Sequence, residues 1–185
     1  MANSEASAPN PRARLTGFIY LLNMVTGLET MLDRGTPLAA YNFPVGLFAA
    51  ACYVAVTLLL YVLFRPVNKY LSLIAMLFSF AGSAEGISNM FGGHFTGVNF
   101  LVFFGFYCVL IGYLAFRSTF MPRIIGVLLI LAGLGYLTLL WPQFGQSLVP
   151  YNYAPGLIGE GALTFWLLAR GVDTARWQQM VHGNK

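Results

Sequence analysis

Three glutamates, Glu29, Glu85 and Glu160, occur in stretches that are otherwise rich in apolar residues. Glu85 lies within "SFAGSAEGISNMF" and Glu160 within "PGLIGEGALTFWLL". A carboxyl group removed from water holds its proton more tightly and can serve as a general acid at neutral pH, while a better solvated carboxylate can serve as the base. We therefore expect Glu85 or Glu160 to be an acid and Glu29 to be a base or to stabilise a cation.

Each glutamate belongs to a stripe of polar or small residues spaced by three or four positions, which places the stripe on one face of a helix. Polar faces avoid lipid, so the three stripes predict one inward-facing pocket. The expected substrate-binding residues on these stripes and on the neighbouring fourth helix are Asn23, Thr26, Asn89, Asn99, Tyr107, Tyr153 and Thr164. The alternative for each glutamate is a structural hydrogen bond to a neighbouring helix, worth about 1 kcal/mol.

Other residues near this pocket have simpler interpretations. Asp33 stands beside Arg34, which is typical of a solvated helix end, and His94 stands between Gly93 and Phe95 in a predicted loop. A Glu/Glu/His metal site stays open, but no HxxxH or HExxH pattern supports it, so we predict no metal and no other cofactor. The two cysteines, at positions 52 and 108, form no CxxC pair, and we expect both to be buried core residues.

The composition predicts a membrane protein. Hydrophobic residues make up 58% of the 185 residues and charged residues only 9%. A water-soluble domain carries about 25% charged residues, so this chain has too few of them to cover a surface that faces water. The ten Lys and Arg residues are spread singly along the chain, which argues against a nucleic-acid partner.

Six stretches have the length of about 20 mostly apolar residues that a membrane-crossing helix needs. Turn-forming sequences such as "RGTP", "RPVNK" and "GGHFTG" separate them. The predicted fold is therefore an all-α bundle of six transmembrane helices. The predicted spans are Leu15–Leu32, Phe43–Phe64, Tyr70–Phe91, Val98–Phe116, Ile124–Trp141 and Tyr153–Ala169.

Basic residues set the expected orientation. Only Arg34 falls on one side of the predicted bundle, and the positive-inside rule places the opposite side, with both termini, in the cytoplasm. The expected organisation is a disordered cytoplasmic N-terminus (1–11), the membrane domain (12–171) and a cytoplasmic tail (172–185). The three glutamates, Asp33 and His94 then cluster in the outer half of the bilayer. The basic residues expected on the cytoplasmic side are Arg12, Arg14, Arg65, Lys69, Arg117, Arg123, Arg170, Arg176 and Lys185.

Several segments resemble a bacterial family of six-helix membrane proteins that is catalogued only as a domain of unknown function. The likeness covers about residues 13–171 and is carried by "ARLTGFIYLL", "LLYVLFRPVNKYLSLIAMLF", "FFGFYCVLIGYLAFRSTFMPRIIGVLLILAGLGYL" and "PGLIGEGALTFWLLARG". The resemblance implies a multi-pass protein of the bacterial inner membrane with this topology, and it implies no activity. Glu160 matches an acid in the family pattern, whereas Glu85 with Asn89 is less clearly a family feature.

A polar pocket within the bilayer suits a lipophilic substrate such as an isoprenoid, a sterol-like or a quinone-like molecule. Protonating an alkene or opening an epoxide there would lead to cyclisation or isomerisation. A proton- or cation-coupled transporter is the rival hypothesis, because carriers also use buried acids. Against transport, the inner half of the predicted bundle has no embedded charge and no interrupted helix. A lipid-binding protein or assembly partner is the third hypothesis, and the oligomeric state stays open.

Overall fold

Helices account for all regular secondary structure in the described part of the chain. The computed structural model describes residues 9–32 and 42–183, and at positions 9–10, 28–32, 42 and 183 it describes the backbone alone. The six long helices are α1 (Pro9–Leu32), α2 (Asn42–Phe64), α3 (Lys69–Met90), α4 (Phe100–Arg117), α5 (Arg123–Leu137) and α7 (Ala154–Ala169). The shorter ones are η2 (Thr138–Leu140), α6 (Pro142–Ser147), η3 (Tyr151–Tyr153) and α8 (Thr174–Gly183).

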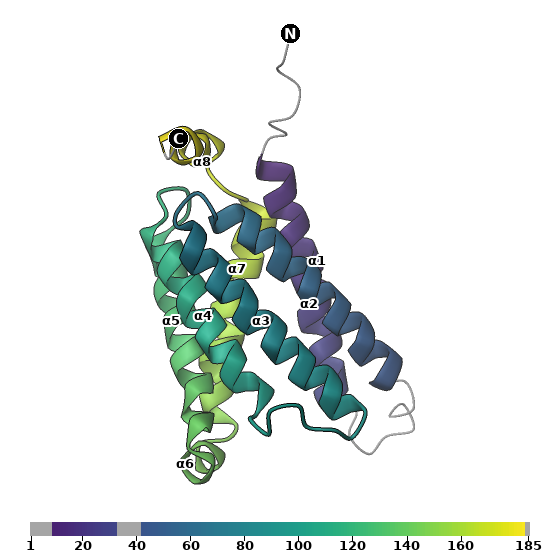
Figure 1. The fold of residues 1–185 in the computed structure, drawn as a ribbon. Helices are drawn as coiled ribbons and strands as arrows, with labels where there is room; N and C mark the ends of the chain where they lie inside the picture. Colours follow the sequence, from purple (N-terminus) through teal and green to yellow (C-terminus); the bar gives the residue numbers. More distant parts are fainter. Residues whose placement is uncertain (1–8, 33–41, 184–185) are drawn as a thin grey trace.

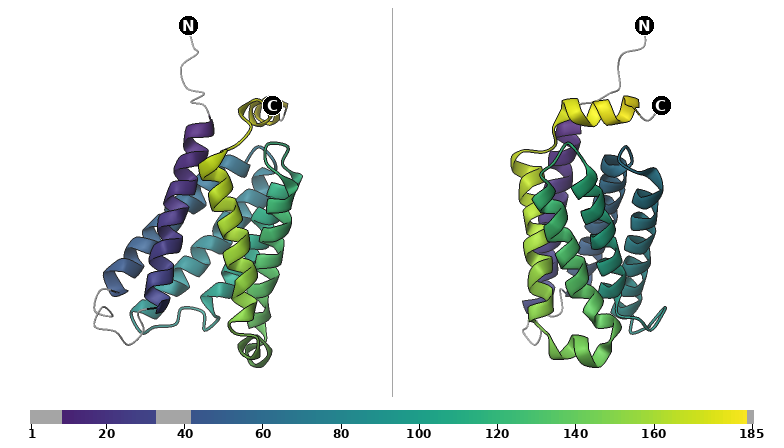
Figure 2. Two further views of the ribbon diagram at one scale, coloured as in Figure 1. Left: turned by 180° about the vertical axis from the view of Figure 1, so that it is seen from behind. Right: turned by 90° about the vertical axis from the view of Figure 1, so that its left-hand side faces the viewer.

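The long helices form a closed ring in chain order. Each of α1, α2, α3, α4 and α5 packs against the next long helix, and α7 packs against both α5 and α1 (Figures 1 and 2). Successive helices run in opposite directions because the connections between them are short. The start of α1 and the final helix α8 consequently lie at the same end of the bundle.

Four helices of the described part are long and apolar enough to cross a membrane. They are α2, α3, α4 and the continuous stretch of α5 and η2, with bounds Phe43–Phe64, Lys69–Met90, Phe100–Arg117 and Arg123–Leu140. Their ends lie within two residues of the corresponding predicted spans. The predicted all-helical, multi-pass membrane fold is thus confirmed at this level. The first and sixth predicted spans correspond to α1 and α7, which complete the ring.

Local sequence signals account for where several helices begin and end. The side-chain oxygens of Asn68 and Asn99 accept hydrogen bonds from the backbone N–H groups of Leu71 and Leu101, each at 3.0 Å, and so cap the N-termini of α3 and α4. Gly171 has a positive φ of 67° directly after α7, a conformation that glycine adopts without steric cost. These caps fix the ends of three ring helices.

Glycines bring α4 and α5 into the closest contact of the ring. Gly105 and Gly112 of α4 face Gly133 and Gly126 of α5, and a Cβ atom built on Gly126 would lie 2.5 Å from the backbone nitrogen of Phe116. No larger side chain fits between these backbones. Small residues at such interfaces are typical of helix packing in membranes, where close approach rather than hydrophobic burial drives association.

All lysines and arginines within the described residues lie at the end of the bundle that carries the start of α1 and the helix α8, which we call the basic end (Figure 1). Asp173 is the single acid of the described residues at this end, and it pairs with Arg176 at 3.3 Å between Nε and Oδ2. The basic end is therefore strongly positive. Its residues are Arg12, Arg14, Arg65, Lys69, Arg117, Arg123, Arg170 and Arg176.

The helix α8 crosses the basic end roughly at right angles to the ring helices (Figure 2). The indole Nε1 of Trp177 donates a hydrogen bond to the backbone carbonyl of Leu63 at 3.0 Å, and Nη1 of Arg176 donates to the carbonyl of Thr119 at 3.1 Å. The sequence predicts a cytoplasmic tail for this segment and gives no sign that it docks on the bundle. Its docking depends on backbone carbonyl groups near the ends of α2 and α4, where the helix no longer supplies hydrogen-bond donors for them.

Candidate functional site

Glu160 of α7 points into the ring and is 7% exposed. The hydroxyl of Tyr20 on α1 donates a hydrogen bond to its Oε2 at 3.0 Å, and the hydroxyl of Tyr136 on α5 donates to its Oε1 at 2.9 Å. These two tyrosines come from the two helices that flank α7. Both oxygens of the carboxyl group are therefore held by phenol donors from opposite sides.

Polar side chains from the other ring helices surround this carboxyl group. Tyr53, Tyr107 and Cys108 lie close enough to interact electrostatically with Glu160. Next to them the hydroxyls of Thr57 on α2 and Ser79 on α3 are joined by a 2.6 Å hydrogen bond. We call this group the central polar cluster, and all of its members are buried. It comprises Tyr20, Tyr53, Thr57, Ser79, Tyr107, Cys108, Tyr136 and Glu160, with at least one residue from every ring helix.

Two hydroxyl groups of the cluster have no hydrogen-bond partner within the described residues. The hydroxyls of Tyr53 and Tyr107 lie near those of Ser79 and Thr57, respectively, but neither pair reaches hydrogen-bonding geometry. Buried polar groups are bonded in the large majority of cases, and each exception calls for an explanation. The two phenols are thus available to a polar group that enters the cluster.

Aromatic rings form a wall beside Glu160. The ring centroid of Phe104 lies 4.9 Å from that of Tyr53 and 5.6 Å from that of Tyr136, and Tyr107 lies 6.0 Å from Tyr53. Tyr136 also contacts Tyr153 at 6.3 Å. The faces of such rings attract cations when water is excluded. A positive charge that develops beside Glu160 would meet both a carboxylate and aromatic faces.

Glu85 belongs to a second site at the far end of the bundle. Its Oε2 accepts hydrogen bonds from the backbone N–H and the hydroxyl of Thr96, at 2.7 and 2.9 Å, and Nδ1 of His94 lies 3.9 Å from Oε1. The side chain is inaccessible to solvent because the loop of residues 91–99 folds over it, although it lies near the end of α3. Gly92 and Gly97 provide the positive φ angles, 74° and 72°, at two turns of this loop. We call Glu85, His94 and Thr96 the loop site.

Glu85 and Glu160, two of the three predicted catalytic glutamates, have separate sets of contacts within the described residues. Glu85 and Glu160 share no hydrogen-bond partner among the described residues. The backbone of Glu29 lies in α1, but its side chain is outside the described part, as is Asp33. The contacts assign Glu160 to the centre of the ring and Glu85 to its rim.

Two predicted binding residues on α1 make structural hydrogen bonds. The Nδ2 of Asn23 donates to the backbone carbonyl of Ala49 on α2 at 2.8 Å, so it links two ring helices. The hydroxyl of Thr26 donates to the carbonyl of Leu22 in its own helix at 2.8 Å. Neither residue joins the central polar cluster.

The other predicted binding residues divide between the cluster and the rim. Tyr107 is part of the cluster, and Thr164 is fully buried one turn from Glu160, where its hydroxyl lies 3.5 Å from the sulfur of Met24. Asn89 is exposed near the end of α3. Asn99 caps α4 and Tyr153 only touches the aromatic wall, as described above.

The sequence pattern does not predict four members of the cluster, which are Tyr20, Tyr53, Thr57 and Tyr136. The aromatic residues in general are typical of membrane core and interface belts. Tyrosines concentrate at membrane interfaces, so a tyrosine well inside an apolar span is unusual and is the signal that would have pointed to three of these residues. Cys108, predicted to be buried in the core, is 1% exposed. No group of three or more His, Cys, Asp or Glu side chains is close enough to hold a metal ion within the described residues.

Comparisons with known proteins agree with the resemblance noted above. A family model described as "Domain of unknown function (DUF4386)" matches residues 93–171, which include Tyr107, Tyr136 and Glu160 but not Glu85. An uncharacterized protein of Archaeoglobus fulgidus is 30% identical over 127 residues, which cover 64% of this chain and 76% of the relative. No solved structure matches the chain. The chain is a member of the DUF4386 family of domains of unknown function.

Proposed function

We propose that this protein is a membrane-embedded acid–base enzyme of the cyclase or isomerase type that acts on a lipophilic, isoprenoid-like molecule at the central polar cluster. The observation that carries the proposal is Glu160, a buried carboxyl group held by Tyr20 and Tyr136 beside two phenols without partners. A carboxyl group fixed in this way is preorganised for proton transfer.

The proposal includes the full topology of six spans with both termini in the cytoplasm of a bacterial inner membrane. In it, α1 and α7 cross the bilayer beside the four strongly apolar helices, because they line the same ring over a similar length. The positive-inside rule then assigns the basic end to the cytoplasmic side.

Cysteine labelling tests this topology. Thr119 is exposed at the basic end and Gln146 is exposed on α6 at the other end. We expect a membrane-impermeant maleimide to label Gln146→Cys, but not Thr119→Cys, in intact cells. Cys52 and Cys108 are buried, so the unmodified chain serves as the blank. Labelling of Thr119→Cys from outside would overturn the arrangement.

The proposed chemistry balances without a further reactant. The carboxyl group of Glu160 donates its proton to one carbon of a double bond, and the carbocation that forms is stabilised by the aromatic faces of Tyr53, Phe104 and Tyr107. Loss of a proton from a neighbouring carbon to the Glu160 carboxylate completes an isomerisation and restores the acid. If Glu29, the second candidate base, takes the proton instead, Glu160 must regain a proton from water and Glu29 must release one before the next turnover. Internal attack by another double bond before the carbocation loses its proton completes a cyclisation.

Deuterium incorporation tests this reaction whatever product is formed. Proteoliposomes that contain squalene and a linear polyprenol are incubated in D2O, and the recovered lipids are analysed by mass spectrometry. We expect time-dependent deuterium uptake with the wild-type chain. Glu160→Gln keeps the shape of the side chain but cannot transfer a proton, so the rate should fall by about 10²–10⁴-fold.

Asp173→Asn is the matched acid-to-amide control, because this acid is exposed just before α8, at the basic end. It should retain the full rate of deuterium uptake. Glu160→Gln with an unchanged rate would refute the acid–base proposal, and so would the absence of uptake from every probe by a folded wild-type protein.

Transport is the second candidate, and one observation favours it. The central polar cluster lies well inside the bundle and includes residues of all six ring helices, as do the central sites of many carriers. A proton-coupled carrier would give a Glu160-dependent pH change inside liposomes with no chemical change in the lipids. A lipid-binding or assembly partner would give neither signal.

A further inference from the structure

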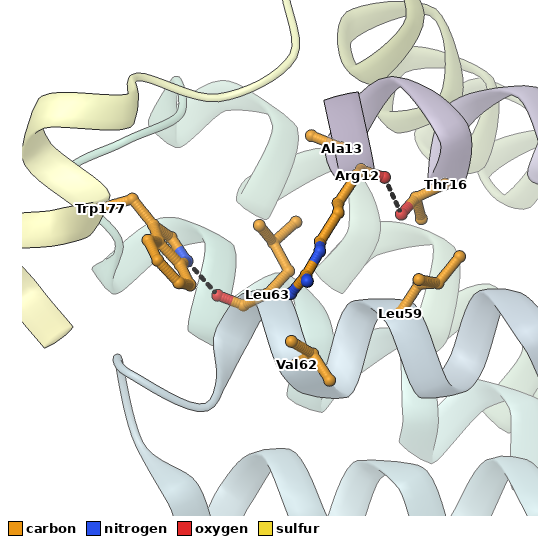
Figure 3. A pocket seen from close by; sticks show the side chains of 7 residues that line it. All are labelled: Arg12, Ala13, Thr16, Leu59, Val62, Leu63 and Trp177. Carbon is orange, nitrogen blue, oxygen red and sulfur yellow. Dashed lines mark hydrogen bonds between the residues drawn. The ribbon is translucent and has the colours of Figure 1, made fainter. Parts of the chain in front are cut away.

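A small cavity of about 30 Å³ lies at the basic end, far from both glutamate sites. Arg12 and Thr16 of α1, Leu59 and Val62 of α2, and Trp177 of α8 line it (Figure 3). The side chain of Arg12 reaches across the gap from α1 towards Val62 on α2. One charged group thus sits among apolar side chains from three helices.

The charge of Arg12 has no counter-ion within the described residues. The only carboxylate of the described residues at this end, Asp173, pairs with Arg176. The hydroxyl of Thr16, the neutral polar group of the lining, donates to the backbone carbonyl of Arg12 at 2.8 Å and carries no charge to balance the guanidinium. The cavity is consequently complementary to an anion, and the other basic residues of this end add to the attraction.

The rest of the lining is apolar and reaches the outer surface of the bundle. Val62 is 40% exposed on the outside of α2. The ring of Trp177 borders the cavity while its indole N–H is held by the carbonyl of Leu63 at 3.0 Å. An amphipathic indole fixed at a helix end is typical of the level of lipid head groups. The site therefore suits a ligand with an anionic head and an apolar tail.

We infer that this cavity binds the phosphate group of an anionic phospholipid, with the first part of an acyl chain along Leu59 and Val62. Arg12 supplies charge-assisted hydrogen bonds to the phosphate, and Trp177 fixes α8 against the bound lipid. Basic pockets between transmembrane helices are known places for lipid head groups. The site does not depend on the chemistry proposed for Glu160 and requires only that this end of the bundle meets the membrane surface.

Native mass spectrometry of the full chain tests the site. Protein stripped of lipid in a neutral detergent is titrated with phosphatidylglycerol or with phosphatidylcholine of the same acyl chains. We expect one tightly bound phosphatidylglycerol per chain and weaker, non-stoichiometric binding of phosphatidylcholine. Arg12→Gln should weaken the phosphatidylglycerol step by about tenfold, the loss expected for one charge-assisted contact.

Arg14→Gln is the matched control, because it removes the same charge from the same turn of α1 but does not line the cavity. It should leave the stoichiometric step unchanged. An equal loss in both variants would mean that the charged surface attracts lipid without a site, and would overturn the inference.

Val62→Phe provides a second test that leaves every charge in place. The position is partly exposed, so α2 should tolerate the larger ring, and the ring should fill the cavity and weaken binding about as much as Arg12→Gln does. Unchanged binding of phosphatidylglycerol to this variant would contradict the site. Inorganic phosphate that displaces the lipid at similar concentrations would also contradict it, because the cavity would then be a site for free phosphate.

Discussion

Glu85 and Glu160 are both hidden from solvent, yet the chain hides them in different ways. The partners of Glu160 lie 140 and 24 residues away along the chain, on two other ring helices. The partner of Glu85, Thr96, lies 11 residues away in the adjoining loop. Burial alone therefore does not distinguish the roles of these two acids. The difference lies in the element that buries each one, which is a ring of helices for Glu160 and a loop for Glu85.

The two sites also differ in what happens when a hydrogen bond is lost. At the centre of the ring, water can replace a missing partner only if the helices separate. At the loop site, the partner of Glu85 belongs to a loop and not to a ring helix, so we expect a lost hydrogen bond there to disturb the loop rather than the ring. The proposed catalysis therefore fits Glu160 better than Glu85, and we expect Glu85 to order the loop at the mouth of the bundle. Five variants test this division, in order of expected effect.

The largest effect on stability is expected for Glu160→Leu. The substitution leaves the hydroxyls of Tyr20 and Tyr136 buried without an acceptor, which should lower the free energy of unfolding by about 2 kcal/mol. Thermal unfolding in detergent, followed by circular dichroism, measures it. Glu160→Gln keeps an acceptor and should cost less than half as much, so equal losses for the two variants would show that the hydrogen bonds are not the cause.

Glu85→Leu should act on the loop rather than on the ring. Removing the acceptor for Thr96 frees residues 91–99, so limited proteolysis should cut there severalfold faster while the melting temperature falls less than in Glu160→Leu. Mass spectrometry of the fragments locates the cut. Glu85→Gln is the control, since its amide oxygen can still accept from Thr96. A larger loss of stability for Glu85→Leu than for Glu160→Leu would reverse the comparison.

Removal of the phenol hydroxyls one at a time should have smaller effects. Tyr20→Phe and Tyr136→Phe should each lower the free energy of unfolding by about 0.6 kcal/mol, the average for such bonds in membrane helices. Tyr113→Phe, at an exposed position on α4, should change nothing. A double-mutant cycle that combines each tyrosine variant with Glu160→Gln measures the coupling free energy between the phenol and the carboxyl group. A coupling free energy of zero would mean that the tyrosines do not support the carboxyl group.

The smallest effect is expected for His94→Ala. The imidazole is 74% exposed and lies 3.9 Å from Glu85, and exposed ion pairs contribute little because water and salt screen them. The melting temperature in detergent and the cleavage rate in residues 91–99 should match those of the wild type at pH 7.5. A clear fall in the melting temperature, or a clear rise in the cleavage rate, would assign His94 a larger share in holding the loop than its exposure predicts.

Much of the fold is readable from local sequence. Apolar stretches predict the positions of the helices. The asparagines at positions 68 and 99 precede two of them, as is typical of N-cap residues. The turn glycines and the one-sided arginines place the connections and the basic end. Each of these signals acts over a few residues, so it is present in the chain before any helix meets another. Membrane class, helix ends and the presence of buried acids were therefore determined by the sequence.

The partners of the acids were decided only by the tertiary structure. Helical spacing identifies the polar face of each helix but not the helix that the face meets. Glu160 meets Tyr20 because α7 closes the ring against α1, and Tyr136 joins them because glycine packing sets the position of α5 against α4. Glu85 lies on an equally good stripe, yet it is turned to its own loop because it stands only five residues before the end of α3. Contacts between residues 140 positions apart depend on the packing of every helix between them, and no local pattern records that packing.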